Sequence, residues 1–410
     1  MTEVKKDIRR CSKEEICSFF VSHNAPSFHG NQVYEWLWQK AAIDFEQMTN
    51  LSKAHRALLD KHFIINHTNI AKVQISDDGT IKNAVRLYDD KVVESVLEKP
   101  VLFTNQVVGE KTTEIVKNSK PGQIVLIENL RYYPQEEAGN NSFAKELSKL
   151  AESYVNDAFG TAHRAHASTS VVAEFFKGNK FAGDLLLKEV DSIKKVIEDG
   201  KKPVLAILGG AKVSSKITII NNIIDKIDKL IIGGGMAFTF IKAQGGKIGA
   251  SICENDKIDL ALSILEKAKN NNVEVFLPTD VLCANDFSND ADTQVCLINN
   301  IPDNWQGMDA GPMSLKHFKK AIESSKTILW NGPVGVFEME TFSKGTIALG
   351  NYISESTASG SFSLVGGGDS VAAVKQFNFS NKVSYVSTGG GAMLESLEGK
   401  TLPGIKALEE

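Results

Sequence analysis

The sequence lacks the features that mark several special classes of protein. None of its five cysteines forms a C-x-x-C pair, which argues against a zinc site or a disulfide framework and predicts reduced thiols. The most apolar long stretch, residues 230–241, is bounded by Lys229 and Lys242 and is shorter than the about 20 residues that cross a bilayer. The N-terminus has no apolar core and does not read as a secretory signal. A formal net charge of −4 provides no basic field for nucleic acid or membranes. We therefore expect a cytoplasmic protein with scattered thiols at Cys11, Cys17, Cys253, Cys283 and Cys296.

The first hundred of the 410 residues follow a pattern of their own. Ser12 and Glu15 form a capping-box pattern that predicts a helix start, and GNQVYEWLWQK and LSKAHRALLDKHF predict two further amphipathic helices. Residues 71–97 then alternate between apolar and polar, with expected turns at Asp78-Gly79 and Asp89-Asp90. This pattern predicts a three-stranded antiparallel meander, and with the helices it makes a small α+β unit.

After Pro100 the pattern becomes that of βα repeats. GQIVLIENLRYY and SYVNDAF contain short apolar strands. From residue 203 onward a strand, a glycine-rich turn and a helix follow one another four times, at PVLAILGG, KLIIGGG, SFSLVGGGDS and VSYVSTGGG. We therefore predict an α/β fold with a doubly wound parallel sheet and glycine turns at the carboxyl ends of its strands.

Those glycine turns favour a nucleotide site. Glycines let backbone N–H groups approach an anion, and the helix that follows adds a favourable dipole. A single such turn often serves only tight packing, whereas four in one half of the chain favour ligand binding. GGAKVSSK, residues 209–216, is not a P-loop, because Lys212 follows the glycines too early. We interpret Lys212 and Lys216 as an i, i+4 pair on the opening turn of a helix, aimed at a phosphate crevice; the alternative is a solvated helix face.

Other motifs supply further candidate residues. WNGPVGVFE, residues 330–338, offers the Asn331 amide, a turn at Pro333 and the Glu338 carboxylate for ribose hydroxyls. In GGGDS, Asp369 at a helix start could hold Mg²⁺ beside phosphates, or could simply cap the helix. Arg131 and Arg164 suit carboxylates and phosphates, and structural ion pairs explain them equally well.

Six motifs, taken in order from about Val101 to Leu408, resemble those of the phosphoglycerate kinase family. They are ENLRYYP, YVNDAFGTAHRAHAST, GGAKVSSKI, NGPVGVFE, GGGDS and STGGGAMLESLEGKTLPGIKAL. The resemblance implies reversible phosphoryl transfer between 1,3-bisphosphoglycerate with ADP and 3-phosphoglycerate with ATP, using Mg²⁺ held by Asp369. It implies that Lys212 and the Gly389–Gly391 amides, notably Gly390 and Gly391, face the transferred phosphoryl group, and that Arg131 and Arg164 bind phosphoglycerate. It also implies a nucleotide site made of Lys212, Lys216, Gly234, Gly235, Asn331, Pro333, Glu338, Gly366, Gly367, Gly368, Asp369 and Ser370.

Residues 1 to about 99 resemble a different family, the N-terminal accessory region of radical-SAM rRNA adenine methyltransferases. The C-x-x-x-C-x-x-C cluster motif of those enzymes is absent, and 14 basic residues balance 14 acidic ones over residues 1–100. The Asp-x-Asn motif, the arginine used in transfer and the His-x-x-Arg-Pro segment of phosphoglycerate kinases are also missing before residue 101. A fused gene and a misassembled reading frame both explain this junction.

These resemblances imply a two-lobed kinase with parallel Rossmann-like sheets and an incomplete N-terminal sheet, preceded by the small α+β unit. The expected parts are 1–99, 100–180 for phosphoglycerate, 181–202 as an interdomain helix, 203–390 for the nucleotide and 391–410 returning to the N-terminal lobe. We expect a monomer that acts on small molecules, without membrane or nucleic-acid partners. An active kinase, an inactive nucleotide-binding protein and an RNA-directed module remain as alternatives.

Overall fold

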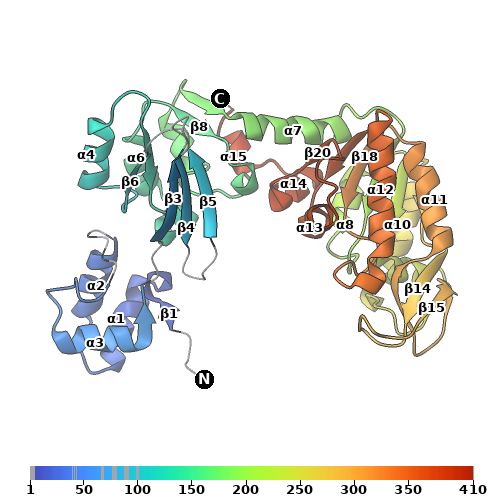
Figure 1. The fold of residues 1–410 in the computed structure, drawn as a ribbon, viewed down its shortest axis with the longest axis horizontal. Helices are drawn as coiled ribbons and strands as arrows, with labels where there is room; N and C mark the ends of the chain where they lie inside the picture. Colours follow the sequence, from blue (N-terminus) through green and yellow to red (C-terminus); the bar gives the residue numbers. More distant parts are fainter. Residues whose placement is uncertain are drawn as a thin grey trace. The chain divides into compact units, whose positions relative to one another are not determined.

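The computed structural model describes residues 5–38, 40, 42, 44–65, 69–75, 81–86, 92–97 and 101–409. They divide into two compact units. Unit 1 comprises Met1–Tyr154 and Ala165–Lys180, and unit 2 comprises Val155–Arg164 and Phe181–Glu410. Figure 1 labels many of their helices and strands. The described residues contain no helix that is both long and apolar enough to cross a membrane.

Unit 1 begins with three helices, as the sequence predicts. They are α1 (Lys13–Ser22), α2 (Phe28–Trp38) and α3 (Lys53–His62), accompanied by the paired short strands β1 (Lys6–Asp7) and β2 (Phe63–Ile64). The predicted capping box is present: the Ser12 hydroxyl accepts the Glu15 N–H at 3.0 Å, and the Glu15 carboxylate accepts the Ser12 N–H at 2.7 Å. The α1 and α2 backbones approach closely at Gly30, where a Cβ would lie 2.6 Å from the Cys17 nitrogen. This small residue therefore lets the two helices bury Phe20 between them and α3.

The predicted antiparallel meander follows the helices. Its strands are β3 (Asn69–Ile75), β4 (Ile81–Arg86) and β5 (Val92–Leu97), paired in that order. The expected turns at Asp78-Gly79 and Asp89-Asp90 lie outside the described residues.

The rest of unit 1 is built around a short parallel sheet. β6 (Val101–Thr104) pairs with β7 (Ile124–Ile127), and the accompanying helices are α4 (Glu110–Asn118), α5 (Pro134–Glu137) and α6 (Asn141–Ser148). Phe103 and Leu126, one on each strand, are each 52% exposed. A parallel sheet is ordinarily covered on both faces, so these exposed side chains confirm the predicted incomplete sheet.

Unit 2 contains a six-stranded, wholly parallel sheet, which confirms the predicted doubly wound fold. The strand order is β13-β11-β10-β18-β19-β20. The strands are β10 (Val204–Leu208), β11 (Lys229–Ile232), β13 (Glu274–Phe276), β18 (Thr327–Asn331), β19 (Phe362–Val365) and β20 (Tyr385–Val386). Every residue of β10 and β18 is buried, as expected for central strands with helices on both faces.

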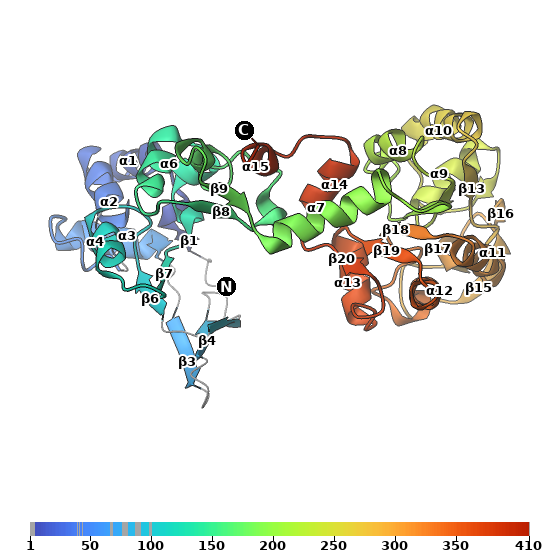
Figure 2. The ribbon, with the colours of Figure 1, turned by 90° about the horizontal axis from the view of Figure 1, so that it is seen from above.

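The helices of unit 2 cover the two faces of this sheet (Figure 2). Ala206 and Leu208 pack on one face, and Leu205 and Ile207 on the other, because successive side chains of a strand point to opposite faces. The first face carries α7 (Asp184–Ile197), α8 (Ile217–Ile223), α9 (Met236–Ala243), α10 (Ile258–Asn270) and α14 (Gly390–Leu397). The second carries α11 (Pro312–Glu323), α12 (Lys344–Ala358) and α13 (Gly368–Gln376).

A smaller antiparallel sheet, for which the sequence analysis made no prediction, lies beyond α10. β14 (Asp280–Ala284) pairs with both β15 (Thr293–Leu297) and β17 (Gln306–Ala310).

Two pairs of short strands and one short helix complete the described strands and α-helices. β12 (Lys247–Ile248) pairs with β16 (Asn300–Ile301), and β8 (Tyr154–Asn156) pairs with β9 (Lys180–Ala182). The helix α15 (Pro403–Lys406) lies near the C-terminus.

Candidate nucleotide and phosphate site

The glycine turns of unit 2 interlock at the carboxyl edge of the large sheet. A Cβ on Gly209, after β10, would lie 2.0 Å from the Pro333 carbonyl oxygen, and one on Gly332, after β18, would lie 2.3 Å from the Gly209 oxygen. Gly332 also has a φ of +116°, which side chains disfavour. The Gly210 N–H donates to Pro333 at 3.2 Å, and Gly234 meets Gly210 at the same place. The backbones therefore approach one another more closely than any other residue type allows.

The predicted geometry of Lys212 and Lys216 is wrong. α8 begins at Ile217, so Lys216 precedes the helix and Lys212 lies in an exposed turn. The turn is closed by local hydrogen bonds: the Ser215 hydroxyl donates to the Lys212 carbonyl at 2.8 Å. Ser214 also donates to Glu254, through its N–H at 3.0 Å and its hydroxyl at 2.6 Å. Serine side chains thus compete with helical hydrogen bonds here, and the two lysines do not share one helix face.

Lys216 is held by the loop after β18. Its ammonium donates to the Asn331 Oδ1 at 2.6 Å, while the buried Asn331 Nδ2 donates to the Gly366 carbonyl at 2.8 Å. Burial lowers the pKa of Lys216, and the negative charge of Asp369 opposes that effect. A half-buried ammonium in this position would gain from an additional anion, such as a phosphate.

Two helix N-termini, those of α13 and α14, lie side by side. A Cβ on Gly390 would be 3.6 Å from the Gly368 nitrogen, so the two glycine turns are in van der Waals reach. The first N–H groups of a helix have no partner within it and attract anions. The Gly366–Gly368 turn, expected at the nucleotide, and the Gly389–Gly391 turn, expected at the transferred phosphoryl group, are therefore adjacent.

Asp369 and Ser370 occupy the first turn of α13 and play different parts. Asp369 is exposed, and the N-cap of the helix is Gly367, so the simple capping interpretation of Asp369 is wrong. Ser370 is buried, and its hydroxyl accepts the Gly332 N–H at 2.5 Å. Among the described residues no cluster of three or more potential metal ligands occurs. Mg²⁺ often needs only one or two carboxylates together with substrate phosphates, so a lone accessible Asp369 fits this ion.

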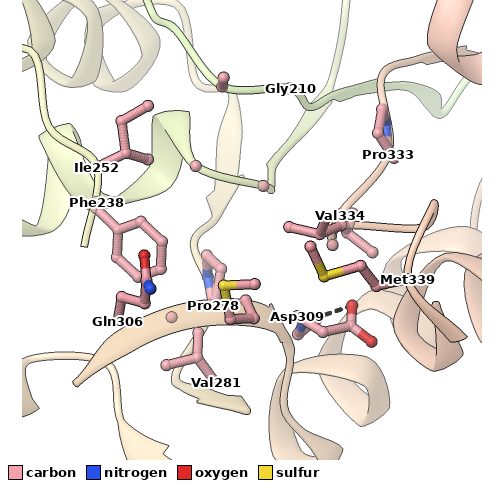
Figure 3. A pocket seen from close by; sticks show the side chains of 18 of the residues that line it. Gly210, Phe238, Ile252, Pro278, Val281, Gln306, Asp309, Pro333, Val334 and Met339 are labelled. Carbon is pink, nitrogen blue, oxygen red and sulfur yellow. Dashed lines mark hydrogen bonds between the residues drawn. The ribbon is translucent and has the colours of Figure 1, made fainter. Parts of the chain in front are cut away.

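A cavity of about 600 Å³ opens beside these turns (Figure 3). Of the residues predicted for the nucleotide, Gly234, Gly235, Pro333, Glu338 and Asp369 line it. The lining does not include several other predicted residues of unit 2, namely Lys212, Lys216, Asn331, Gly366–Gly368, Ser370, Gly390 and Gly391. Its apolar walls include Phe238, Ile252, Pro278, Val281, Phe287 and Ile298, none of which the sequence analysis proposed. No short motif marks them, because they come from separate segments. A cavity of this size with apolar walls and a few polar groups is typical of a nucleotide-sized ligand.

Asp309, at the end of β17, is a buried carboxylate in the cavity wall that the sequence analysis missed. Only 4% of it is exposed, and it accepts N–H groups from Ala310 at 2.8 Å and Gly345 at 2.6 Å. Burial raises its pKa to about 7, while these two hydrogen bonds and the nearby Lys344 charge act in the opposite direction. The available signal was a single aspartate inside the apolar strand GMDAGP.

The two predicted phosphoglycerate arginines lie in different units. Arg131, in unit 1, is 3.8 Å from a Glu137 oxygen and remains accessible. Arg164, in unit 2, is exposed. In the same segment of unit 2, His163 has a buried Nδ1 without a hydrogen-bond partner among the described residues, and its ring is within 3.2 Å of where a Gly391 Cβ would be.

The fold and the site together define a phosphate-handling nucleotide enzyme. They combine a parallel α/β sheet with interlocked glycine turns, adjacent helix N-termini, a half-buried lysine and an accessible aspartate. The family model described as phosphoglycerate kinase matches residues 63–400. The phosphoglycerate kinase of Porphyromonas gingivalis is 50% identical over 341 residues, covering 77% of this chain and 82% of its own. That of Prochlorococcus marinus is 43% identical over 411 residues and covers 99% of both chains. The structure of phosphoglycerate kinase from Coxiella burnetii has a TM-score of 0.69 at 44% identity, covering 75% of this chain and 76% of that one.

The chain belongs to the phosphoglycerate kinase family, kinases of glycolysis, as the six motifs predict. A second family model, the ribosomal RNA large subunit methyltransferase N-terminal domain, matches residues 1–65. The predicted resemblance of the N-terminal region to that family is thereby confirmed over residues 1–65. The two matches meet at residues 63–65, whereas the change of sequence pattern lies near residue 100.

Proposed function

We propose that unit 2 binds ADP and ATP with Mg²⁺ as a phosphoglycerate kinase does, and that this chain transfers the phosphoryl group slowly. The observation that supports nucleotide binding is the convergence of four glycine turns, Lys216 and Asp369 beside one cavity. The family supplies the reaction, between 1,3-bisphosphoglycerate with ADP and 3-phosphoglycerate with ATP. Location in the cytoplasm and a monomeric state are part of the same proposal.

Each candidate residue has a role that suits its position. Lys216 binds nucleotide phosphates, Lys212 reaches the transferred phosphoryl group, and Asp369 holds Mg²⁺, which would neutralise phosphate charge when bound. Ser370 keeps the loop after β18 in place, since its hydroxyl accepts the Gly332 N–H. The remaining contacts are the base at Gly234 and Gly235, the phosphate chain at Asn331, the ribose at Glu338, the phosphoryl group at the Gly390 and Gly391 amides, and phosphoglycerate at Arg131 and Arg164.

Slow transfer follows from the acceptor side of the reaction. Phosphoryl transfer depends on alignment of both substrates and on neutralising charge around the transferring group. The first hundred residues contain neither an Asp-x-Asn nor a His-x-x-Arg-Pro segment. An arginine that acts on the transferred group is worth roughly 10³ to 10⁵ in rate, or about 4–7 kcal/mol, in other phosphoryl-transfer enzymes.

Two measurements on the full chain test the two parts of the proposal. Titration calorimetry with MgADP should show binding, and Lys216→Ala should weaken it by about 1.5–3 kcal/mol, the usual worth of a hydrogen bond to a charged group. Lys316→Ala, which removes an exposed lysine of α11, is the matched control and should leave the affinity unchanged. Absence of MgADP binding by the unmodified chain would overturn the first part.

A coupled assay of 1,3-bisphosphoglycerate formation tests the second part. We expect turnover well below the roughly 1–100 s⁻¹ of ordinary kinases. Turnover within that range by sequence-verified protein would show that the first hundred residues replace the missing acceptor contacts.

A second candidate function, delivery to RNA, rests on the match of residues 1–65 to a ribosomal RNA methyltransferase domain. Binding of this kind depends steeply on salt, because phosphate contacts release counterions. A titration with structured RNA at two salt concentrations tests it, and an affinity no tighter than that of a chain lacking residues 1–65 would exclude it.

A further inference from the structure

Gln306 is an amide at the apolar end of the cavity. The surrounding walls are side chains such as Phe238, Ile252 and Ile298, and Figure 3 shows the Gln306 amide beside the Phe238 ring. The other polar side chains of the lining are the carboxylates Asp309, Glu338 and Asp369. Within the described part of the chain, the Gln306 amide has no hydrogen-bond partner, so its donor and acceptor are both available to a ligand.

The position of Gln306 is set by β17 and not by a loose loop. It is paired with Ala284 of β14, and the next residue, Gly307, donates its N–H to the Ser251 hydroxyl at 2.9 Å. A Cβ on Gly307 would be 2.2 Å from the tip of the Phe238 ring, so the ring lies directly on the strand at this residue. The strand therefore fixes the backbone from which Gln306 reaches the cavity wall, where a flat aromatic base would be enclosed.

An amide can pair with the hydrogen-bonding edge of a purine. Adenine presents an exocyclic N–H donor next to a ring-nitrogen acceptor, and a carboxamide matches this pair with its oxygen and its NH₂ group. Guanine presents O6 as an acceptor next to its N1–H donor. Rotation of the amide by half a turn exchanges oxygen and nitrogen, so the same side chain matches this edge as well.

We propose that Gln306 is the specificity-determining residue for the base, reading the hydrogen-bonding edge of a purine and accepting both adenine and guanine nucleotides. The inference rests on the nucleotide function proposed above and deepens it. It predicts that the unmodified chain binds MgADP and MgGDP with dissociation constants within about threefold of each other, because two amide hydrogen bonds form with either base.

Two substitutions at this position separate base reading from packing. Gln306→Leu removes both polar groups, and we expect it to weaken MgADP and MgGDP alike, by about 3- to 30-fold. Gln306→Glu preserves the shape and, when ionised, offers acceptors only. The carboxylate faces two guanine donors, N1–H and the exocyclic amine, but opposes the ring-nitrogen acceptor of adenine. The ratio of GDP to ADP affinity should therefore rise by about tenfold or more at pH 8.

The ratio of GDP affinity to ADP affinity is the decisive quantity, since a general loss of folding or added negative charge weakens the binding of both nucleotides equally. Gln294→Glu changes an exposed glutamine on β15, at the other edge of the same three-stranded sheet; it is the matched control and should leave the ratio unchanged. Calorimetry of the full chain with each nucleotide supplies all the values, with thermal unfolding to confirm that each variant is folded. A ratio that Gln306→Glu leaves within twofold of the unmodified value would overturn the inference, as would undiminished affinity in Gln306→Leu. If the unmodified chain bound neither nucleotide, the proposed function itself would fail, which is a distinct result.

Discussion

The buried carboxyl of Asp309 predicts an unusual dependence of stability on pH. Its folded-state pKa of about 7 exceeds the ordinary 3.8, so between these values the folded protein holds a proton that the unfolded chain has released. Stability from this group is therefore complete below pH 3.8 and is lost as the pH rises through 7. Most structural carboxylates have lowered pKa values and behave in the opposite way.

The size of the effect follows from the two pKa values. Linkage gives an added destabilisation of about 2–3 kcal/mol between pH 5 and pH 8. For a domain of this size each kcal/mol corresponds to roughly 2–4 °C in Tm, so the expected decrease is about 5–10 °C. Asp309→Asn retains the shape but cannot ionise, although it leaves one of the two N–H donors from Ala310 and Gly345 facing an NH₂ group. We therefore compare slopes with pH and not absolute stabilities.

Unfolding should be followed through Trp330, which is fully buried in β18 of the same unit, with Asp303→Asn as a control at an exposed position. We expect the stability of the unmodified chain and of Asp303→Asn to fall in parallel between pH 5 and pH 8. The Asp309→Asn profile should fall less steeply, by about 2–3 kcal/mol over this range. Identical pH profiles for unmodified chain and Asp309→Asn would refute the reasoning.

Three further predictions concern the site and the N-terminal region. Gly332→Ala places a Cβ 2.3 Å from the Gly209 oxygen at a φ of +116°. We expect this substitution to lower the free energy of unfolding, measured with urea, by at least about 2 kcal/mol and to abolish MgADP binding. Near-wild-type values for both would contradict the interlocked-turn geometry. Asp369→Asn should weaken MgADP about tenfold in calorimetry but should not weaken ADP in excess chelator, because without the cation the carboxylate only repels the phosphates; equal losses in both conditions would reject this role. Deletion of residues 1–97 should leave nucleotide affinity unchanged, since the described nucleotide candidates all lie in unit 2, and a tenfold loss would show otherwise.

Local patterns were sufficient to predict much of the fold. The capping box at Ser12 and Glu15, the antiparallel pairing of β3, β4 and β5 and the four strand–glycine–helix repeats each appear as predicted. These features depend on neighbours within about ten residues, where helix caps and side-chain periodicity act directly.

The geometry of the lysine turn was not predictable in this way. Helical periodicity continues through residues 212–216, yet Ser214 bonds to Glu254, forty residues further along, and the helix begins only at Ile217. The competition between a helical turn and a distant carboxylate is decided only when the chain is folded.

What the sequence by itself determined is the family, the order of the elements and the residue types proposed for phosphate binding, because glycine turns and charged groups recur at characteristic distances along the chain. The tertiary structure alone decided which of these groups meet and in what state. It enclosed Asp309 and raised its pKa, brought Phe238, Ile252 and Gln306 to one end of a cavity, and placed the turns of α13 and α14 side by side. Burial, dielectric environment and contact between distant segments arise from packing, and no local pattern encodes them.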